Sequence, residues 1–375
     1  MTIGVLKETG PETRVSLLPE HVAQLTKKGH KVLIELGAGA KAFANDAQYA
    51  SAGGQVVEQA EIFAQAQLIF AMHLQGQASW PAAVFVGNYQ PLFAAQAMQQ
   101  LANRQVTTFS LDLLPRTTRG QAMDILSSQA NIAGYKAVLL AATLLPRYFP
   151  MLMTAAGSIA PAKLLILGAG VAGLQAIATA KRLGAVVEVF DTRPAVKEEV
   201  QSLGAKFVEV EGAADASKAG GYAVEQTEEF KQRQQQKISD SAAKADVIIT
   251  TAAIPGKQAP ILITTAMLER MRPGSVIIDL AAATGGNTSL TQNDQTVVHN
   301  GVNIVSGSHL AATTPADASK LYGKNLLNFL ELITHKEGHL NLNFDDDLVK
   351  GCCITHGGQV VHERVAALLK SPSAQ

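Results

Sequence analysis

Residues 164–180 read Leu-Leu-Ile-Leu-Gly168-Ala-Gly170-Val-Ala-Gly173-Leu-Gln-Ala-Ile-Ala-Thr-Ala. Four apolar residues precede the glycines, and an alanine-rich run with a helical pattern follows them. This order predicts a buried strand, a tight turn and a helix. In such a unit Gly168 permits the turn, Gly170 lets the backbone approach a pyrophosphate, and Gly173 lets the helix pack on the strand. The stretch predicts a dinucleotide-binding Rossmann unit, with a purely structural glycine turn as the alternative.

The next apolar run, residues 186–190, is followed directly by Asp191. A carboxylate about 20 residues beyond the glycines can accept hydrogen bonds from both ribose hydroxyls of an adenosine and repel a 2′-phosphate. Arg193 could accommodate such a phosphate, but Asp191 occupies the position that contacts the hydroxyls. We therefore predict that this chain binds NAD(H) rather than NADP(H).

Short apolar runs separated by helical patterns extend on both sides of this unit. The predicted strands are residues 2–6, 31–36, 68–72, 83–87 and 107–111, then 164–167, 186–190, 247–251, 276–280 and 302–305. Strands that alternate with helices form parallel sheets. The predicted fold class is α/β, with two Rossmann-like, doubly wound parallel-sheet domains and a cleft between them.

Two long helical patterns, near residues 120–145 and 318–333, divide the chain. They predict a discontinuous first domain of residues 1–126 plus 315–375 and an NAD(H)-binding Rossmann domain of residues 135–312, linked by these helices. A length of 375 residues suits two domains, each large enough for its own core.

One segment fits neither series of strands and helices. Residues 211–221 are rich in alanine and glycine, and the polar residues 226–236 follow them. Long loops without secondary structure are often functional lids. We predict a mobile loop that leads into a solvated helix, with a flexible surface insertion as the alternative.

Composition argues against several classes of protein. The formal net charge is zero and no basic run alternates with aromatic residues, so nucleic-acid binding is not expected. The apolar runs at residues 138–145 and 164–180 are too short or too rich in glycine to enter a membrane directly. The two cysteines, Cys352 and Cys353, lack the spacing of a zinc site, and no metal site is expected. The first residues contain no secretory signal, which favours a cytoplasmic location.

A second polar constellation precedes and opens the helical pattern near residue 125. It contains Arg116, Gln121, Asp124 and Ser127. Asp124 and Ser127 are three residues apart and share a helix face, so they could bind one planar polar group such as a nicotinamide carboxamide. The alternative is a helix cap with a surface ion pair between arginine and aspartate.

Residues 116–135, 168–193 and 250–257 closely resemble the NAD(H)-binding alpha subunit of proton-translocating nicotinamide nucleotide transhydrogenase, in the alanine dehydrogenase/transhydrogenase family. The resemblance spans nearly the whole chain and includes residues 219–223 and 274–280. Among these matches, the arginine, glutamine, aspartate and serine of the second constellation are the most diagnostic of the transhydrogenases.

The resemblance implies a role for each matching residue. Arg116, Asp124 and Ser127 would orient the nicotinamide carboxamide, and Gln121 would reach toward a nucleotide on a partner subunit. Gly221 and Tyr222 would belong to a loop that closes over bound NAD(H). Beside Gly168, Gly170 and Gly173, the residues implied to line the cofactor site are Val171, Ala172, Asp191, Thr192, Arg193, Gln234 and Ala253.

The resemblance also implies partners. Hydride would pass directly between NADH on this chain and NADP⁺ on a partner subunit, and membrane-spanning subunits would translocate protons. The chain would lie in the cytoplasm, peripheral to the inner membrane through those subunits. A homodimer is expected, and the composition agrees with extensive buried interface because only 17% of residues are charged and 47% are hydrophobic.

Two alternatives to this function are an NAD-dependent alanine dehydrogenase and an NAD-binding paralogue without catalysis. The first family shares the opening that contains Arg14, but it supplies a lysine and a histidine at two strand ends for base catalysis and carboxylate binding. Here those ends read Ala71-Met-His73 and Gly87-Asn-Tyr89, and His73 is predicted to be an incidental surface histidine. The second alternative follows from loops 281–287 and 306–314, which depart from the pattern of many relatives.

Overall fold

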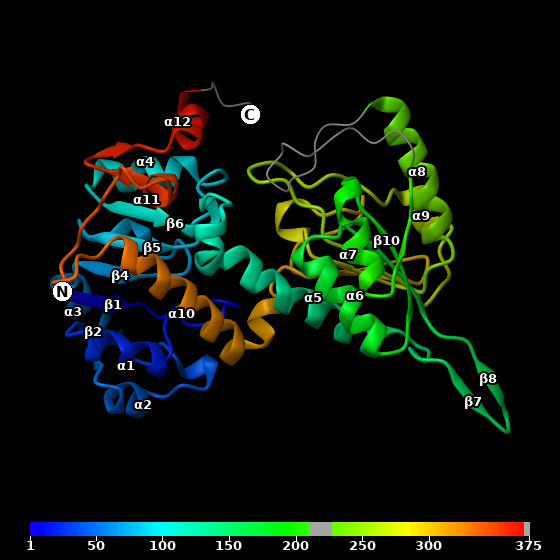
Figure 1. The fold of residues 1–375 in the computed structure, drawn as a ribbon, viewed down its shortest axis with the longest axis horizontal. Coiled ribbons are helices and arrows are strands. Elements are labelled where there is room, and N and C mark those ends of the chain that lie inside the picture. The colour runs from blue at the N-terminus through cyan, green and yellow to red at the C-terminus, as the bar shows by residue number, and fades with distance from the viewer. Residues whose placement is uncertain (211–226, 371–375) are drawn as a thin grey trace. The chain divides into compact units, whose positions relative to one another are not determined.

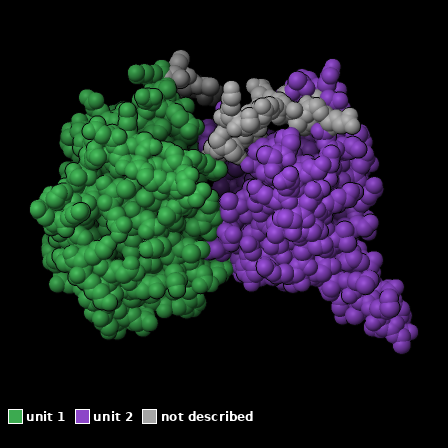
Figure 2. Space-filling model, in the orientation of Figure 1, with its two compact units in different colours: residues 1–129, 312–375 green, residues 130–311 purple. Residues whose placement is uncertain are grey.

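The computed structural model describes residues 1–210 and 227–370, with β-sheets and helices throughout (Figure 1). The chain forms two compact units, coloured separately in Figure 2. Unit 1 contains residues 1–129 and 312–375, and unit 2 contains residues 130–311. Unit 1 is therefore discontinuous in sequence.

Unit 2 is built on a seven-stranded sheet in the order β11-β10-β9-β12-β13-β15-β14. All neighbouring strands are parallel except β14, which pairs antiparallel with β15. The strands are β9 Lys163–Leu167, β10 Val186–Phe190, β11 Lys206–Phe207, β12 Val247–Thr250, β13 Val276–Asp279, β14 Thr296–His299 and β15 Val302–Ser306. The chain order reverses on either side of the β9–β12 pair, which is the topological switch point of a doubly wound sheet.

Both faces of this sheet are covered. Alternate residues of β9 enter two different cores, with Leu164 and Ile166 in one and Leu165 and Leu167 in the other. A strand buried on both faces is apolar throughout, which explains the continuous apolar runs in the sequence. The helices of this unit are α6 Val171–Arg182, α7 Lys197–Ser202, α8 Glu228–Ala242 and α9 Thr265–Glu269, together with the later part of α5 Ile125–Leu144.

Unit 1 contains an eight-stranded sheet in the order β17-β16-β6-β5-β4-β1-β2-β3. The strands are β1 Thr2–Val5, β2 Lys31–Glu35, β3 Gln55–Val57, β4 Leu68–Phe70, β5 Val84–Gly87, β6 Thr107–Ser110, β16 Cys353–His356 and β17 Gln359–Val360. The first six are parallel, and β16 and β17 add an antiparallel edge. Its switch point lies between β1 and β4, so both sheets follow the same winding rule.

Seven α-helices lie wholly within the described part of unit 1, around two hydrophobic cores. They are α1 Pro19–Lys27, α2 Asp46–Ser51, α3 Gln59–Gln65, α4 Ala95–Asn103, α10 Pro315–Leu332, α11 Asp347–Cys352 and α12 Glu363–Lys370. The longest of them, α10, brings Tyr322, Leu326 and Phe329 into the same core as β1 and β4.

A two-stranded hairpin projects from unit 2 (Figure 1). It pairs β7 Leu152–Thr154 with β8 Gly157–Ile159 in antiparallel register. Met151 beside it and Met153 within it are 64% and 74% exposed. Tyr148 and Ile159 on the same segment are also exposed, so apolar side chains gather on this hairpin.

The structure confirms the predicted α/β fold class and its two doubly wound sheets. Each of the ten predicted strands is present, with ends that differ by at most two residues. The sequence did not predict β3, β11, β14 or the two short antiparallel pairs, because their segments lack the longer apolar runs that marked the predicted strands. Among residues 1–210 and 227–370, no helix has the length and apolar character that a membrane span requires.

Candidate nucleotide-binding site

The three glycines form the turn between β9 and α6. Gly168 has φ +107°, and a Cβ placed there would lie 2.3 Å from Thr251 Oγ1. A Cβ at Gly173 would lie 1.9 Å from the carbonyl oxygen of Gly168, so only glycine lets the helix sit this close to the turn. A Cβ at Gly170 would meet no atom within 4 Å. The turn therefore leaves open space beside the backbone at Gly170.

A hydrogen bond from the segment after β12 holds the glycine turn, and helix α6 begins directly after the turn. The hydroxyl of Thr251, directly after β12, donates to the carbonyl of Gly168 at 3.1 Å. Helix α6 begins at Val171, which is 40% exposed, and Ala172 follows in the same first turn. The first N–H groups of a helix lack intrahelical acceptors, and the helix dipole adds positive potential. The residues at this end can therefore hold a phosphate.

Asp191 follows β10 and bonds directly to the glycine turn. Its Oδ2 accepts from the amide of Ala169 at 2.7 Å and from Arg193 Nη2 at 2.8 Å. Its Oδ1 accepts from the amide and Nε of Arg193 at 2.8 and 2.9 Å. The hydrogen bond to Asp191 raises the pKa of Arg193. Because the carboxylate already accepts four hydrogen bonds, a ribose must displace part of the Arg193 guanidinium to reach it.

The remaining predicted residues of unit 2 lie on three further elements. Thr192 is partly buried after β10, Ala253 is exposed in the loop after β12, and Gln234 is buried in α8. The structure thus bonds Asp191 both to Ala169 within the glycine turn and to Arg193, and it connects the loop after β12 to the turn through Thr251. Gly221 and Tyr222, with the predicted mobile loop, lie outside the described residues.

A buried pair that the sequence did not reveal organises the loop after β12. Asn287 is fully buried, and its side chain bonds to both the N–H and the C=O of Ala252, at 3.0 and 2.8 Å, and to the carbonyl of Pro260 at 2.8 Å. Asp279 accepts from the amide of Asn287 at 2.7 Å. Asn287, in the loop 281–287, therefore fixes the backbone beside Ala253. No sequence signal marks an asparagine whose partners are backbone groups.

In unit 1, Asp124 and Ser127 form a side-chain pair at the start of α5. Asp124 Oδ1 accepts from the amide of Ser127 at 2.9 Å, and Oδ2 accepts from its hydroxyl at 2.6 Å. Asp124 therefore caps helix α5. The cap still leaves unused lone pairs on the carboxylate and on the serine oxygen. Arg116 and Gln121 are exposed just before the helix, the latter in the 3₁₀ helix Thr118–Met123.

The switch point of unit 1 is filled by a buried charged cluster. Arg14 donates to Glu12 through Nε at 2.8 Å and Nη2 at 2.6 Å, and its Nη1 donates to Gln129 at 2.8 Å. His73 Nε2 lies 2.8 Å from Glu12 Oε2, and its side chain is only 33% exposed. The prediction of an incidental surface histidine is therefore wrong, because His73 follows β4 and meets the residues that follow β1.

Burial and pairing act in opposite directions on the two carboxylates of this cluster. Burial raises the pKa of Glu8 to about 7, although His73 and the amide of Met72 oppose the shift. Burial also acts to raise the pKa of Glu12, but hydrogen bonds from Arg14 and His73 outweigh it and hold that pKa well below its usual range. Near pH 7 the cluster thus holds a charged Glu12 and a Glu8 that is poised to titrate.

Two doubly wound sheets, one with a glycine turn and an acid after its second strand, define a protein of the dinucleotide-binding α/β class. Residues 4–133 match the family described as "Alanine dehydrogenase/PNT, N-terminal domain", and residues 137–363 match "Alanine dehydrogenase/PNT, C-terminal domain". The chain therefore belongs to the alanine dehydrogenase/PNT family.

Individual relatives show which members of this family the chain resembles in sequence and structure. An NAD(P) transhydrogenase alpha-subunit chain of Rhodospirillum rubrum is 44% identical over 376 residues, covering 96% of this chain and 98% of the relative. The crystal structure of a transhydrogenase from Sinorhizobium meliloti superimposes with a TM-score of 0.84 and 40% identity, covering 97% of this chain and 99% of the other. An L-alanine dehydrogenase structure shares the fold, with a TM-score of 0.79 and 24% identity, covering 98% and 99%. The predicted resemblance to transhydrogenase alpha subunits is confirmed, and the chain is a member of an oxidoreductase family.

Proposed function

We propose that this chain is the NAD(H)-binding component of a proton-translocating transhydrogenase. Hydride passes directly between NADH on this chain and NADP⁺ on a partner subunit. The observation that carries the proposal is the Asp191 carboxylate, bonded to the amide of Ala169 inside the glycine turn. A carboxylate bonded to a glycine turn at a helix N-terminus supports the binding of NAD(H), because NAD(H) presents ribose hydroxyls to such an acid and a pyrophosphate to such a helix end.

The residues of unit 2 fit such a nucleotide. The open space at Gly170 admits a phosphate against the backbone, and the first turn of α6 offers N–H donors. Asp191 binds the ribose hydroxyls when the Arg193 guanidinium moves aside, and its charge repels a 2′-phosphate. Val171, Ala172, Thr192, Gln234 and Ala253 line the same site.

The residues of unit 1 fit the nicotinamide carboxamide. A carboxamide offers two N–H donors and one carbonyl acceptor. Asp124 and the hydroxyl oxygen of Ser127 keep lone pairs for the two N–H groups, because their mutual hydrogen bond leaves acceptor capacity on both side chains. Arg116 donates to the carbonyl, and Gln121, exposed before the helix, contacts the nucleotide on the partner.

The chain's own contribution to the reaction is positioning. Bound NADH supplies the hydride itself, so no side chain need accept a proton from a substrate. Fixing the carboxamide fixes the ring that carries the hydride, and correct orientation can account for a large part of a rate enhancement.

Amino-acid oxidation is disfavoured by the cluster at the β1–β4 switch point. An amino-acid dehydrogenase needs a cation that is available to a substrate carboxylate. Here the Arg14 guanidinium donates to Glu12 and Gln129 from all three of its nitrogens. A substrate carboxylate would have to replace Glu12 at this buried position.

The proposed assembly is a homodimer that meets NADP(H)-binding and membrane-spanning subunits from the cytoplasm, at the inner membrane. The exposed methionines of the β7–β8 hairpin support an interface between copies of this chain. The chain binds neither nucleic acid nor the membrane directly.

The test combines the purified chain with NADH, an NADP⁺-binding transhydrogenase partner and NADP⁺, and follows hydride transfer to an NAD⁺ analogue. Transfer should require the partner, and Asp191→Asn should weaken NADH binding, measured by nucleotide fluorescence. Arg116→Ala should lower the transfer rate with the fold intact. L-Alanine with NAD⁺ is the parallel assay. NADH formation there would contradict the proposal, and NADH binding without transfer would favour a non-catalytic paralogue.

A further inference from the structure

A tight turn after α10 brings two histidines and a glutamate together. The sequence is Thr334-His335-Lys336-Glu337-Gly338-His339-Leu340. Thr334 and Leu340 form an antiparallel bridge, and the amide of His335 donates to the carbonyl of His339 at 2.9 Å. Gly338 has φ +81°, and its amide closes the turn on the carbonyl of His335 at 2.8 Å. The two histidines therefore lie opposite each other across the turn.

Their side chains converge on Glu337. Its Oε2 lies 3.9 Å from the Nδ1 atom of each histidine. The two imidazole rings stack with their centroids 4.8 Å apart and their planes within 19°. One nitrogen or oxygen atom from each of the three side chains lies within 4.8 Å of the other two. All three residues are exposed, so an ion reaches them from solvent.

We propose that His335, Glu337 and His339 bind a divalent first-row transition metal ion such as Zn²⁺, Ni²⁺ or Cu²⁺. Two imidazoles and one carboxylate suit these ions, whereas Mg²⁺ and Ca²⁺ prefer sites made of oxygen atoms alone. Tetrahedral bonds of about 2.0–2.1 Å place neighbouring ligand atoms about 3.3 Å apart. The two histidine–glutamate separations of 3.9 Å are close to that value, and the stacked rings must turn so that one nitrogen of each faces the ion.

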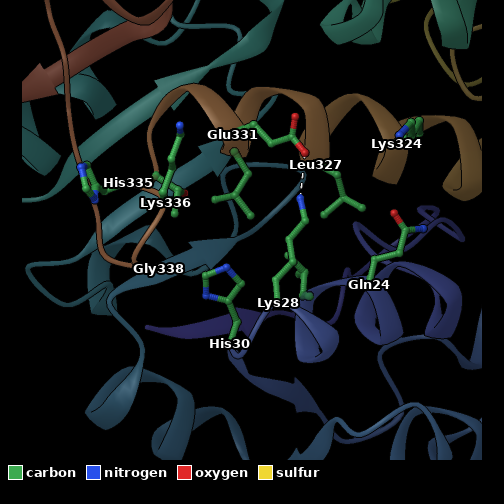
Figure 3. Close-up of a pocket in the computed structure, with 12 residues that line it drawn as sticks. Gln24, Lys28, His30, Lys324, Leu327, Glu331, His335, Lys336 and Gly338 are labelled. Carbon is green, nitrogen blue, oxygen red and sulfur yellow. Dashed lines mark hydrogen bonds and ion pairs between the residues drawn. The ribbon is translucent and has the colours of Figure 1, made fainter.

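Hydrogen bonds anchor the backbone of the turn that carries the three side chains. The carbonyl of Gly338 accepts from the amino group of Met1 at 2.9 Å, and the amide of Asn341 donates to Ile333 at 2.9 Å. A Cβ at Gly338 would lie 3.5 Å from Cε1 of the buried His30, so the turn packs directly on that ring. Figure 3 shows Gly338 next to the His30 ring.

A cavity adjoins one side of the turn, and the three proposed ligand side chains are themselves open to solvent. It measures about 480 Å³ and is lined by His335, Lys336 and Gly338 among others (Figure 3). The ion pair between Lys28 and Glu331, at 2.8 Å, neutralises one of the positive charges that face this cavity. Three protein ligands with solvent at the remaining positions make an open metal site.

The cysteine spacing gave no sign of this site, because its ligands are histidine and glutamate at alternate positions of one turn. The metal also joins the two sides of a turn that packs on the end of α10 and on the start of β1. Binding to the folded state alone raises the thermal midpoint of the chain. The site is independent of the proposed nucleotide function.

The experiment titrates the full chain, with no affinity tag, with Zn²⁺ and Ni²⁺ by calorimetry, with Mg²⁺ as the comparison ion. We expect one site per chain for Zn²⁺ and for Ni²⁺, no heat from Mg²⁺, and a higher thermal midpoint with Zn²⁺. Cu²⁺ bound at the site should give an electron paramagnetic resonance spectrum with coupling to two imidazole nitrogens. Absence of Zn²⁺ and Ni²⁺ binding would overturn the proposal.

The double variant His335→Gln and His339→Gln tests the assignment. Loss of even an outer-shell partner weakens metal sites by roughly 10- to 100-fold, so loss of two ligands should cost at least that. His309→Gln is the matched control, because His309 is also exposed and lies 2.9 Å from a carboxylate of Asp294. The control should bind Zn²⁺ as the unaltered chain does. Undiminished binding by the folded double variant would place the ion elsewhere and refute the site.

Discussion

The two switch points of this chain share one topology and differ in what occupies them. In unit 2, the space beside Gly170 is open and the acid Asp191 borders it. In unit 1, the equivalent crevice between β1 and β4 holds Glu12 and Arg14, paired with each other. A doubly wound sheet creates the crevice, but the side chains decide whether a ligand can enter it. Strand order alone therefore cannot assign a binding site to either unit.

The largest expected effect on stability comes from removing the Glu12 carboxylate that pairs with Arg14 in unit 1. Glu12→Ala leaves the Arg14 guanidinium, whose side chain is 12% exposed, without its carboxylate. Removing one partner of a buried pair costs about 3–5 kcal/mol, and the free energy of unfolding in urea should fall by that amount. Acetate at millimolar concentration should restore some of the loss by pairing with Arg14.

The matched control is Glu331→Ala, which breaks the exposed ion pair with Lys28. Exposed pairs are worth at most about 1 kcal/mol, so this variant should unfold almost as the unaltered chain does. A Glu12→Ala variant as stable as the control would show that the crevice of unit 1 is not held by this pair. Failure of acetate to raise its thermal midpoint would show that the crevice does not admit a carboxylate.

The second prediction concerns the open crevice. Gly173→Ala places a methyl group 1.9 Å from the carbonyl oxygen of Gly168, and this backbone cannot move aside as a flexible side chain could. Overpacking typically costs about 1–3 kcal/mol, and a clash with the backbone should put this variant near the upper end of that range. NADH binding should be lost because α6 is displaced. Urea unfolding and nucleotide fluorescence measure the two effects.

Gly170→Ala separates the two effects, because a Cβ there meets nothing within 4 Å and the backbone has φ −78°. Its stability should match that of the unaltered chain, while NADH binding should weaken by about tenfold or more, or about 1.4 kcal/mol. Full NADH affinity in this variant would mean that no phosphate approaches the backbone at Gly170.

The difference between the crevices also explains what the sequence could and could not predict. The glycines and Asp191 lie in one strand, turn, helix and strand, so their contacts follow from local geometry. His73 and Glu12 are 61 residues apart and meet only because β1 and β4 are neighbours. Pairing between distant strands is a property of the whole sheet, and a histidine at a strand end carries no local sign of its partner.

Asn287 shows a second limit. Its side chain makes two hydrogen bonds to backbone groups of Ala252 and a third to the carbonyl of Pro260. Side chains that bond to the backbone leave no complementary residue type in the sequence. From residue types alone we expected the loop after β13 to be atypical. In the structure its Asn287 holds the backbone next to Ala253.

The third prediction uses pH to distinguish the two buried carboxylates of unit 1, Glu8 and Glu12. Folded Glu8 has a pKa of about 7, against an ordinary value of 4.5, because it is buried. Between these two values the folded chain binds more protons than the unfolded chain, so this group's contribution to stability falls as pH rises. Glu8→Gln removes that dependence and should raise the free energy of unfolding by about 3 kcal/mol at pH 8 and by little at pH 4.5.

Urea unfolding of both proteins at several pH values from 5 to 8 checks this prediction. The difference between them should grow through this range and level off above pH 7. Parallel curves would show that Glu8 is ionised in the folded chain without penalty. Glu12 acts in the opposite direction, because its lowered pKa gives stability that is lost as pH falls below about 4.5, and it is unchanged in this variant.

The smallest effect on stability should come from Asp124→Ser, and it separates the helix cap from the proposed carboxamide site. Serine caps a helix about as well as aspartate, so the bond to the amide of Ser127 can be retained and the free energy of unfolding should change by less than about 0.5 kcal/mol. The variant removes the second carboxylate oxygen, which now accepts from the Ser127 hydroxyl at 2.6 Å. If Asp124 also holds the carboxamide, hydride transfer should fall by at least tenfold while stability stays the same.

Asp124→Ala would lose both functions, with a stability cost of about 1 kcal/mol. Unchanged transfer in the serine variant would mean that the cap is the whole role of Asp124, and the nicotinamide would have to be bound without it.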